Sequence, residues 1–379
     1  MTDGNYTLER NLGQLFLVGF PGKTNQAPQS IRQALAEERI GGTILFRRNL
    51  EDLEQIKELT ESIHQAAALA SAPPFVAIDQ EGGRVVRIRA PLTELPTMRA
   101  LGSAQDLRDV ARVSEVLATE IAALGFNLNF APVLDVDSNP DNPVIGDRAF
   151  SANPERVARC GAGFLVGHHT AGVIPCGKHF PGHGDTLEDS HKALPRLMHD
   201  LERLEAVELF PFERAIAAGI PMLMTAHIEL PLLDAFRPAT LSASILDDLL
   251  RKRLRFEGVI VTDCLEMKAV ADRYEIEEMV ELGLEAGVDL FLICHTEEKW
   301  RRAYNHLLEL ARKDIRIEKR IAASATRIRK MKTDLLGHWT RPWSPSAAML
   351  ATIGCEEHQK IVAPYVKSDT LGLDPTELT

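Results

Sequence analysis

The strongest constraint on the fold of this 379-residue chain is a regular alternation of short apolar runs with longer amphipathic stretches. The runs are rich in Val, Ile, Leu and Phe and do not alternate with polar residues. This composition is typical of parallel strands that are buried on both faces. The eight runs cover 14–20, 42–46, 75–78, 126–136, 172–177, 222–226, 258–262 and 288–294.

The intervening stretches predict helices, and several begin with an Asp, Asn or Ser that can cap the first free amides. The expected helices cover 52–70, 106–124, 153–169, 200–218, 242–254, 276–286, 297–312 and 317–335. Eight strands, most of them followed by a helix, predict an α/β fold of the TIM type, the (β/α)8 barrel. A doubly wound open sheet shows the same alternation, and the strand count alone leaves that alternative open.

The chain is long for one hydrophobic core, so it forms either one large domain or two ordinary ones. Its composition changes only after Gly337, where two prolines and two tryptophans come close together. We therefore assign residues 1–337 to a single barrel domain. Residues 338–379 are too few for a second domain, and we expect a tail that packs on the surface or is partly disordered.

Charge and cysteine content exclude several classes of function. The chain has 54 acidic and 43 basic residues and a net charge of −11, so it lacks the basic footprint of a nucleic-acid-binding protein. Its five cysteines are widely spread without a C-x-x-C pair, which argues against a disulfide framework or a zinc ribbon. The first residues lack a basic leader segment, and no run reaches the roughly 18 apolar residues of a membrane span. We expect a soluble cytoplasmic protein that binds neither nucleic acid nor membrane.

Ionisable residues follow six of the eight apolar runs, and functional groups of a parallel barrel collect at the carboxyl ends of its strands. One such residue is unremarkable, because strand ends often meet water, but six of them indicate a site at that rim. The six positions are Asp79, Asp135, Lys178, His227, Asp263 and His295.

The densest polar segment, 178–191, allows three interpretations. A phosphate loop at 172–178 fails, because His179 stands where magnesium binding needs Ser or Thr and because those residues form a strand. A metal site is chemically possible, but the spacing is not a standard one. Its ligands would be His179, His183 and His191 with Asp185 or Asp189. Acid–base catalysis is the third interpretation, since Asp189 can orient the imidazole of His191 and raise its basicity.

For several other residues, the sequence is compatible with either a functional or a structural role. Asp263 ends a buried strand and is either a nucleophile or the N-cap of the next helix. Arg84 and Arg87 follow a Gly-Gly turn as surface charges or as clamps on hydroxyl or carboxylate groups. The structural role open to Glu81 is only to hold that turn. Two histidines are equally compatible with the core and with a site: His227 and His295.

Three motifs together resemble those of the bacterial β-N-acetylhexosaminidases of glycoside hydrolase family 3. They are K-H-F-P-G-H-G-x-x-x-x-D-S-H at 178–191, I-D-Q-E-G-G-R-V-x-R at 78–87 and G-V-I-x-[ST]-D at 258–263. The first is the most specific, because its Asp-Ser-His separates these enzymes from relatives with a glutamate acid. The resemblance runs from about Leu12 to Leu335 and implies a single barrel, without the second domain of many relatives and without a metal or organic cofactor.

The resemblance also implies roles for individual residues and a small-molecule sugar substrate. Asp263 would be the nucleophile, and His191 the general acid/base with Asp189 as its orienting partner. The N-acetylglucosamine (GlcNAc) ring would be bound by Asp79, Arg87, Arg148, Lys178 and His179. The family reaction removes a terminal β-linked GlcNAc with retention. In Gram-negative bacteria the usual substrate is a cytoplasmic cell-wall fragment, GlcNAc linked to 1,6-anhydro-N-acetylmuramic acid with or without its peptide.

The chemistry agrees with these roles, because retaining hydrolysis needs an attacking carboxylate and a second group that donates and then accepts a proton. A histidine donor departs from the usual carboxylic acid. Two positions depart from the family pattern: Cys264 replaces a common aspartate, and Ala149 replaces a frequent serine. A phosphorylase, a metal-dependent hydrolase and a non-catalytic sugar-binding protein are the alternatives. The oligomeric state stays open, and so does a role of the tail in dimerisation or in covering the site.

Overall fold

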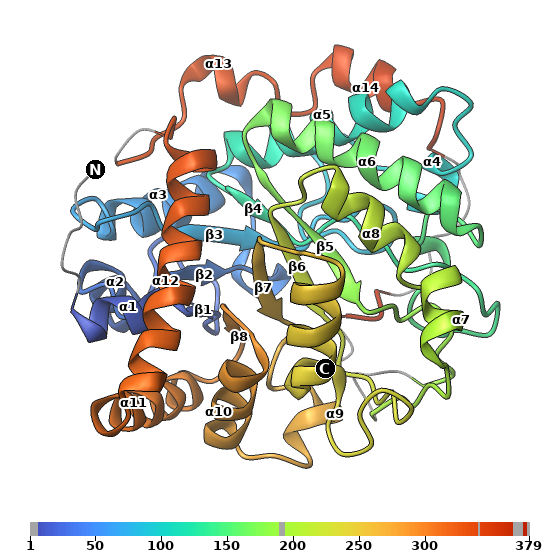
Figure 1. The fold of residues 1–379 in the computed structure, drawn as a ribbon. Helices are drawn as coiled ribbons and strands as arrows, with labels where there is room; N and C mark the ends of the chain where they lie inside the picture. The colour runs from blue at the N-terminus through green and yellow to red at the C-terminus, as the bar shows by residue number, and fades with distance from the viewer. Residues whose placement is uncertain (1–6, 189–193, 340–341, 367–373, 377–379) are drawn as a thin grey trace.

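The computed structural model describes residues 7–188, 194–339, 342–366 and 374–376. Eight parallel strands form its centre and helices surround them (Figure 1). The strands are β1 (Phe16–Val18), β2 (Gly42–Ile44), β3 (Phe75–Ile78), β4 (Leu128–Asn129), β5 (Ile174–Phe180), β6 (Met222–Thr225), β7 (Val259–Thr262) and β8 (Phe291–Ile293). Strand β1 pairs with both β2 and β8, and a bridge between Val261 and Leu290 joins β7 to β8. The predicted (β/α)8 barrel is therefore confirmed, and the open sheet is excluded.

Each strand lies within or across one of the eight apolar runs, and all strand residues are buried. Two strands differ markedly from the predicted runs. Strand β4 has only two residues, although the run covers 126–136. Strand β5, which we predicted to end at Gly177, continues to Phe180. Lys178 and His179 thus belong to the strand itself, and their side chains are buried. The structure tolerates these polar groups because carboxylates from the segments that follow β3 and β4 contact them.

The larger helices lie near the expected positions. They are α3 (Leu53–Ala66), α5 (Leu107–Ala123), α6 (Pro154–Ala171), α7 (Leu201–Ala206), α8 (Phe210–Ala217), η4 (Ser244–Arg253), α10 (Ile276–Ala286), α11 (Glu297–Lys313) and α12 (Ile315–Leu336). Expected caps are present: the carboxylate of Asp52 accepts the amide of Gln55, and the side chain of Asn153 accepts that of Arg156. The helix expected at 200–218 is instead two helices. Pro211 stands in the first turn of α8, where its missing amide is tolerated, so a new helix begins there.

Shorter elements complete the chain and were not expected from the sequence. Four are short α-helices and three are 3-10 turns. They are α1 (Leu8–Gln14), α2 (Gln29–Ala36), α4 (Met98–Leu101), α9 (Lys268–Ala271), η1 (Arg47–Asn49), η2 (Gly146–Arg148) and η3 (Ala239–Leu241). Turns η1 and η2 matter for function, because they place arginines at the same rim of the barrel.

A buried cluster at the amino end of β8 holds the last strands to the outer helices. Asp289 is fully buried, and its Oδ2 accepts the backbone amide of Ile260 in β7 at 3.0 Å. Its Oδ1 accepts Ser324 Oγ at 2.7 Å and the guanidinium of Arg327 at 2.6 Å, both from α12. Arg251 of η4 also contacts this carboxylate. One aspartate thereby connects β7, β8, η4 and α12 at the end of the barrel away from the strand carboxyl ends.

The chain after Gly337 packs on the barrel. Helices α13 (Ala347–Leu350) and α14 (Glu356–Val362) lie beside α5 (Figure 1). The Tyr365 hydroxyl donates to Asp109 of α5 at 2.6 Å, and His358 Nδ1 lies 2.8 Å from Glu120 Oε1. These contacts tie the segment to the barrel surface. The domain boundary at residue 337 stays a prediction.

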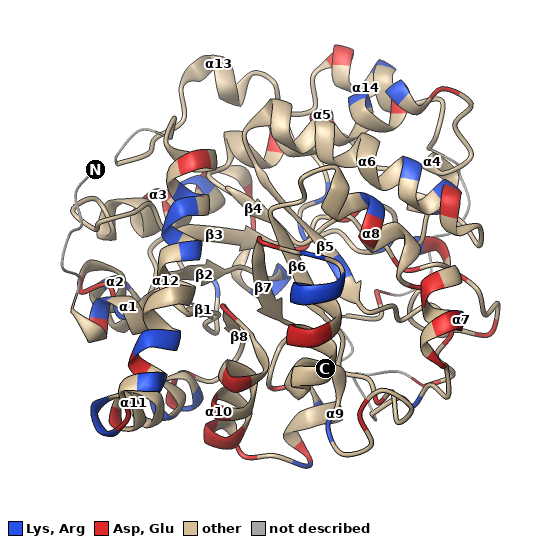
Figure 2. Ribbon diagram, viewed as in Figure 1, with Lys and Arg blue, Asp and Glu red and all other residues tan. Residues whose placement is uncertain are grey.

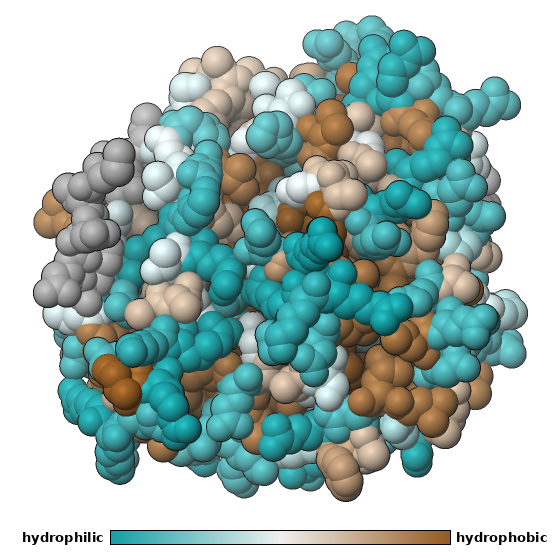
Figure 3. Space-filling model, viewed as in Figure 1, coloured by the Kyte–Doolittle hydropathy of each residue, from teal (hydrophilic) through white to brown (hydrophobic). Residues whose placement is uncertain are grey.

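Charges of both signs cover the outer helices, with acidic residues on α7 and α10 and basic residues on α12 (Figure 2). The face in Figure 3 is largely hydrophilic, and apolar residues gather on its right side. No helix among the described residues combines the length and the apolar character that crossing a bilayer requires.

Candidate active site

A cavity of about 470 Å³ opens at the carboxyl ends of the strands, within the size range of small-molecule sites. Six residues that the sequence singled out as a nucleophile or as sugar ligands all line it: Asp79, Arg87, Arg148, Lys178, His179 and Asp263. Of the other expected strand-end residues, His295 also lines the cavity. Asp135 and His227 do not line it, but each holds a residue that does.

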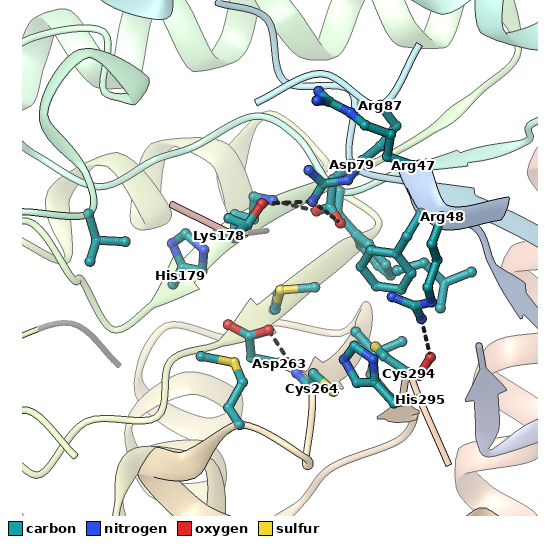
Figure 4. A pocket seen from close by; sticks show the side chains of 18 of the residues that line it. Arg47, Arg48, Asp79, Arg87, Lys178, His179, Asp263, Cys264, Cys294 and His295 are labelled. Atoms are coloured by element: carbon teal, nitrogen blue, oxygen red, sulfur yellow. Dashed lines mark hydrogen bonds and ion pairs between the residues drawn. The ribbon is translucent and has the colours of Figure 1, made fainter. Parts of the chain in front are cut away.

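One wall of the cavity is a network of buried charges. Lys178 Nζ donates to Asp79 Oδ1 at 2.8 Å (Figure 4). It also donates to Glu81 Oε1 at 2.7 Å. Arg148 of η2 makes two parallel bonds of 2.8 Å with both oxygens of Glu81. Glu81 thus joins a strand residue to a residue 67 positions away, which the sequence could not show.

Charge pairing fixes the protonation states in this network. Burial opposes ionisation of Glu81, but Arg148 and Lys178 outweigh it and hold the pKa of that carboxyl far below its usual value. Burial likewise opposes charge on Lys178, yet Asp79 and Glu81 raise the pKa of its ammonium. The wall therefore presents fixed charges, which suits the recognition of hydroxyl groups by charge-assisted hydrogen bonds.

Arg87 lies beside this network, and its side chain is only 1% exposed. Its guanidinium is 3.3 Å from Asp79 and 2.7 Å from Asp374. It also donates to the hydroxyl of Thr376 at 2.8 Å. The last two partners are 287 and 289 positions away in the sequence, and sequence reasoning missed both.

Asp135 organises the loop that follows β5. The imidazole of His179 donates from Nδ1 to Asp135 Oδ2 at 2.7 Å, and the backbone amide of His183 donates to Oδ1 at 2.7 Å. Burial raises the pKa of Asp135, but the two histidines and these hydrogen bonds lower it overall. Burial and the nearby His179 lower the pKa of His183 to about 4. Asp135 therefore orients His179 toward the cavity, and His183 is a neutral residue of the wall.

Asp263 lies on the opposite wall, across the cavity from Asp79 and Lys178 (Figure 4). Its Oδ1 accepts the amide of Cys264 at 2.7 Å. The carbonyl of Cys264 is held in turn by His227 Nε2 at 3.0 Å. Asp263 thus ends β7 with its carboxylate facing the cavity and caps none of the assigned helices, since the next one, α9, begins at Lys268. His227 is a buried support of this turn.

Two cysteines lie next to Asp263. Burial raises the pKa of Cys264, but hydrogen bonds with Cys294 and His295 outweigh burial and lower the pKa of the thiol to about 6. Burial and the hydrogen bond with Cys264 raise the pKa of the Cys294 thiol. The position at which the sequence departs from the family pattern therefore places a thiol of lowered pKa beside Asp263.

Asp189 and His191, the proposed acid/base pair, lie outside the described residues. Described residues on either side of them contact one another, since His199 Nε2 lies 2.8 Å from Asp185 Oδ2.

Asp185, His199 and Glu208 are the one group of potential metal ligands found among the described residues. Arg203 pairs with Glu208 at 2.9 Å and lies 3.7 Å from Asp185. This cation already pairs with both carboxylates. Of the histidines in the metal interpretation, the imidazole of His179 contacts Asp135 and that of His183 contacts the hydroxyl of Thr186 at 2.8 Å. The cluster near His199 does not line the cavity.

Comparison with known proteins agrees with the motifs. The model of the glycosyl hydrolase family 3 N-terminal domain matches residues 7–331. A "Beta-hexosaminidase" of Thiobacillus denitrificans is 41% identical over 273 residues, covering 70% of this chain and 75% of that protein. "Beta-hexosaminidase A" of Pseudoalteromonas piscicida is 36% identical over 362 residues, covering 89% of this chain. This chain spans only 60% of the length of the Pseudoalteromonas protein.

A solved structure gives the same result. The glycoside hydrolase family 3 β-N-acetylglucosaminidase from Paenibacillus sp. str. FPU-7 superimposes with a TM-score of 0.88 at 40% identity. The match covers 95% of this chain and 68% of that one. The family model matches far more than half of the sequence, and the barrel is shared with the solved relative. The chain therefore belongs to glycosyl hydrolase family 3, a family of glycosidases, as the three sequence motifs indicated.

Proposed function

We propose that this chain is a retaining exo-β-N-acetylglucosaminidase, which removes terminal β-linked GlcNAc. The observation that carries the proposal is the single cavity in which the carboxylate of Asp263 faces the charged wall of Asp79, Lys178, Arg87 and Arg148. A sugar ring between these walls places its hydroxyls on fixed charges and its anomeric carbon toward a carboxylate. The relatives named above support the same substrate class.

In the proposed mechanism, a carboxylate oxygen of Asp263 attacks the anomeric carbon of GlcNAc. The bond to the leaving oxygen breaks, and that oxygen takes a proton from the general acid. The resulting glycosyl-enzyme is then hydrolysed by water, which returns its proton to the same group. Two inversions at one carbon give a product that retains the anomeric configuration.

We assign Asp79, Arg87, Arg148, Lys178 and His179 to the binding of the sugar. The contacts that these residues already make leave them different capacities for hydrogen bonds to a sugar. Arg148 binds Glu81 through Nε and one terminal nitrogen and the carbonyl of Val144 through the other. Lys178 divides its donors between two carboxylates. Asp79 and His179 line the cavity with groups that can accept and donate hydrogen bonds. The network is rigid because each charge is paired, and rigid polar groups bind hydroxyls without reorganisation.

We assign the general acid/base role to His191 and the orientation of its imidazole to Asp189. A carboxylate beside an imidazole favours the imidazolium that protonates the leaving oxygen. Asp189→Ala is expected to lower the apparent pKa of the group that must be protonated, and with it the alkaline limb of the pH–rate profile. An unchanged profile of kcat/KM against pH would show that Asp189 has no such role.

The natural substrate we propose is GlcNAc linked to 1,6-anhydro-N-acetylmuramic acid, with or without its peptide, in the recycling of cell-wall fragments in the cytoplasm. This assignment extends the resemblance of the three motifs. The cavity, lined by paired charges and closed below by the barrel core, accommodates the end of a saccharide rather than the middle of a polymer.

The proposal is tested with 4-nitrophenyl N-acetyl-β-D-glucosaminide, with and without phosphate, and with the product followed by NMR. We expect β-GlcNAc as the first product at a rate that phosphate does not change. GlcNAc 1-phosphate as product would instead identify a phosphorylase. Loss of activity with a chelator and its return with a metal ion would identify a metal-dependent hydrolase. Binding without turnover would identify a sugar-binding protein.

A further inference from the structure

We propose that residues 374–376 are part of the sugar-binding site, with Asp374 as a positioning residue for Arg87 and Thr376 as a residue that determines specificity in the cavity. This inference rests on the proposed function. It concerns a part of the chain beyond residues 7–331, which the family model matches. None of the three sequence motifs includes this segment.

The contacts form a closed ring of hydrogen bonds. One terminal nitrogen of Arg87 donates to Asp374 Oδ2 at 2.7 Å, and the other donates to Thr376 Oγ1 at 2.8 Å. The hydroxyl of Thr376 donates onward to Asp374 Oδ1 at 2.6 Å. Both oxygens of the carboxylate and both ends of the guanidinium are thereby engaged. This arrangement holds the plane of the guanidinium in one orientation.

The low exposure of these side chains shows that the contact is buried and does not lie on the protein surface. The side chains of Arg87 and Asp374 are 1% and 7% exposed. Ion pairs on a surface contribute little, but a buried charge that loses its partner is strongly unfavourable. The carboxylate partners of Arg87 therefore offset the free-energy cost of burying its charge in the cavity wall.

Charge balance in the wall leads to the same conclusion. Without Asp374, the connected ion pairs hold three cations, Arg87, Arg148 and Lys178, against two carboxylates, Asp79 and Glu81. Asp374 supplies the third carboxylate. It also helps to raise the pKa of Arg148. The segment therefore completes the electrostatics of a wall that residues of the barrel leave with an excess of positive charge.

Thr376 has a different position, because it lines the cavity itself. Its hydroxyl is hydrogen-bonded to Arg87 and Asp374. The rest of its side chain borders the space beside the Arg87 guanidinium. A sugar group bound by Arg87 must fit against this residue. We expect Thr376 to limit the size of the substituent at that position.

The test compares Asp374→Ala, Asp374→Asn and Asp374→Glu with the parent in the full chain, using steady-state hydrolysis of 4-nitrophenyl N-acetyl-β-D-glucosaminide. We expect Asp374→Ala to lower kcat/KM by about 10- to 100-fold, mainly through KM, the size of a lost charge-assisted hydrogen bond. Asp374→Glu is expected to restore part of the loss, and Asp374→Asn less. Glu356→Ala is the control, since Glu356 is an acid of the same part of the chain with an 81% exposed side chain.

Thr376→Val provides a second measurement if the Asp374 variants lose stability. Its methyl group replaces only the hydroxyl, so we expect folded protein with a raised KM and a nearly unchanged kcat. Unchanged kcat/KM in both Asp374→Ala and Thr376→Val would overturn the inference. An increase would also overturn it, because the segment would then obstruct the cavity. An inactive parent that does not bind GlcNAc in titration calorimetry would refute the proposed function itself, and the inference with it.

Discussion

Replacing Asp263 by Asn is expected to reduce hydrolysis of 4-nitrophenyl N-acetyl-β-D-glucosaminide by at least about 1000-fold, the scale of removing a catalytic nucleophile. The amide is nearly the same size as the carboxylate but is a poor nucleophile, so the covalent intermediate cannot form efficiently. The effect should fall on kcat. The contact between the side-chain oxygen and the amide of Cys264 is preserved in this variant.

A binding measurement distinguishes the loss of the chemical step from the loss of the sugar-binding site. Titration of the Asp263→Asn protein with GlcNAc should give an affinity close to that of the parent, because the opposite wall is intact. Asp147→Asn is a matched control: Asp147 belongs to η2 and pairs with Arg84, and it does not line the cavity. A drop in rate of less than 10-fold in Asp263→Asn would exclude Asp263 as the nucleophile.

Replacing Glu81 by Ala is expected to lower the free energy of unfolding by about 3–5 kcal/mol, the range for breaking a buried ion pair from one side. The variant leaves Arg148 and Lys178 buried with one carboxylate fewer. Reversible urea unfolding of both proteins, followed by circular dichroism, measures the difference. A change below about 1 kcal/mol would mean that water or another acid replaces Glu81.

The pH dependence of stability gives an independent readout for the same residue. The pKa of Glu81 is depressed in the folded state, so its contribution is present above the unfolded pKa and disappears as the pH falls toward the folded pKa. The parent should therefore lose stability on acidification more steeply than Glu81→Gln. Glu81→Gln keeps the shape of the side chain and removes its charge. Parallel curves for the two proteins would contradict a charged Glu81 in the folded state.

The barrel was predictable because buried parallel strands leave a signal within single short runs of sequence. The error in β5 has a physical cause. Lys178 and His179 look like the start of a loop when their partners are unknown, whereas Asp79, Glu81 and Asp135 from the segments that follow β3 and β4 neutralise them in the structure. The short helices α1 and α2 escaped detection because seven or eight residues give few helical repeats.

The candidate site was predictable where a motif carried it, and not where a distant residue completed it. Motifs marked Asp79, Arg87, Lys178 and Asp263, and all of them line the cavity. Glu81 seemed to serve only the Gly-Gly turn, although it is the central anion of the wall. No local pattern marks a residue whose partner is 67 positions away, as Arg148 is from Glu81. The roles of Asp189 and His191 stay predictions.

The buried Asp289 cluster has a consequence for how such a barrel can change its chemistry. It joins β7 and β8 to η4 and α12. These contacts lie at the end of the barrel away from the cavity. The carboxyl ends of the strands therefore do not have to hold the barrel closed. These ends can concentrate desolvated charges and vary single side chains, such as Cys264 beside Asp263, while the contacts between β7 and β8 are kept.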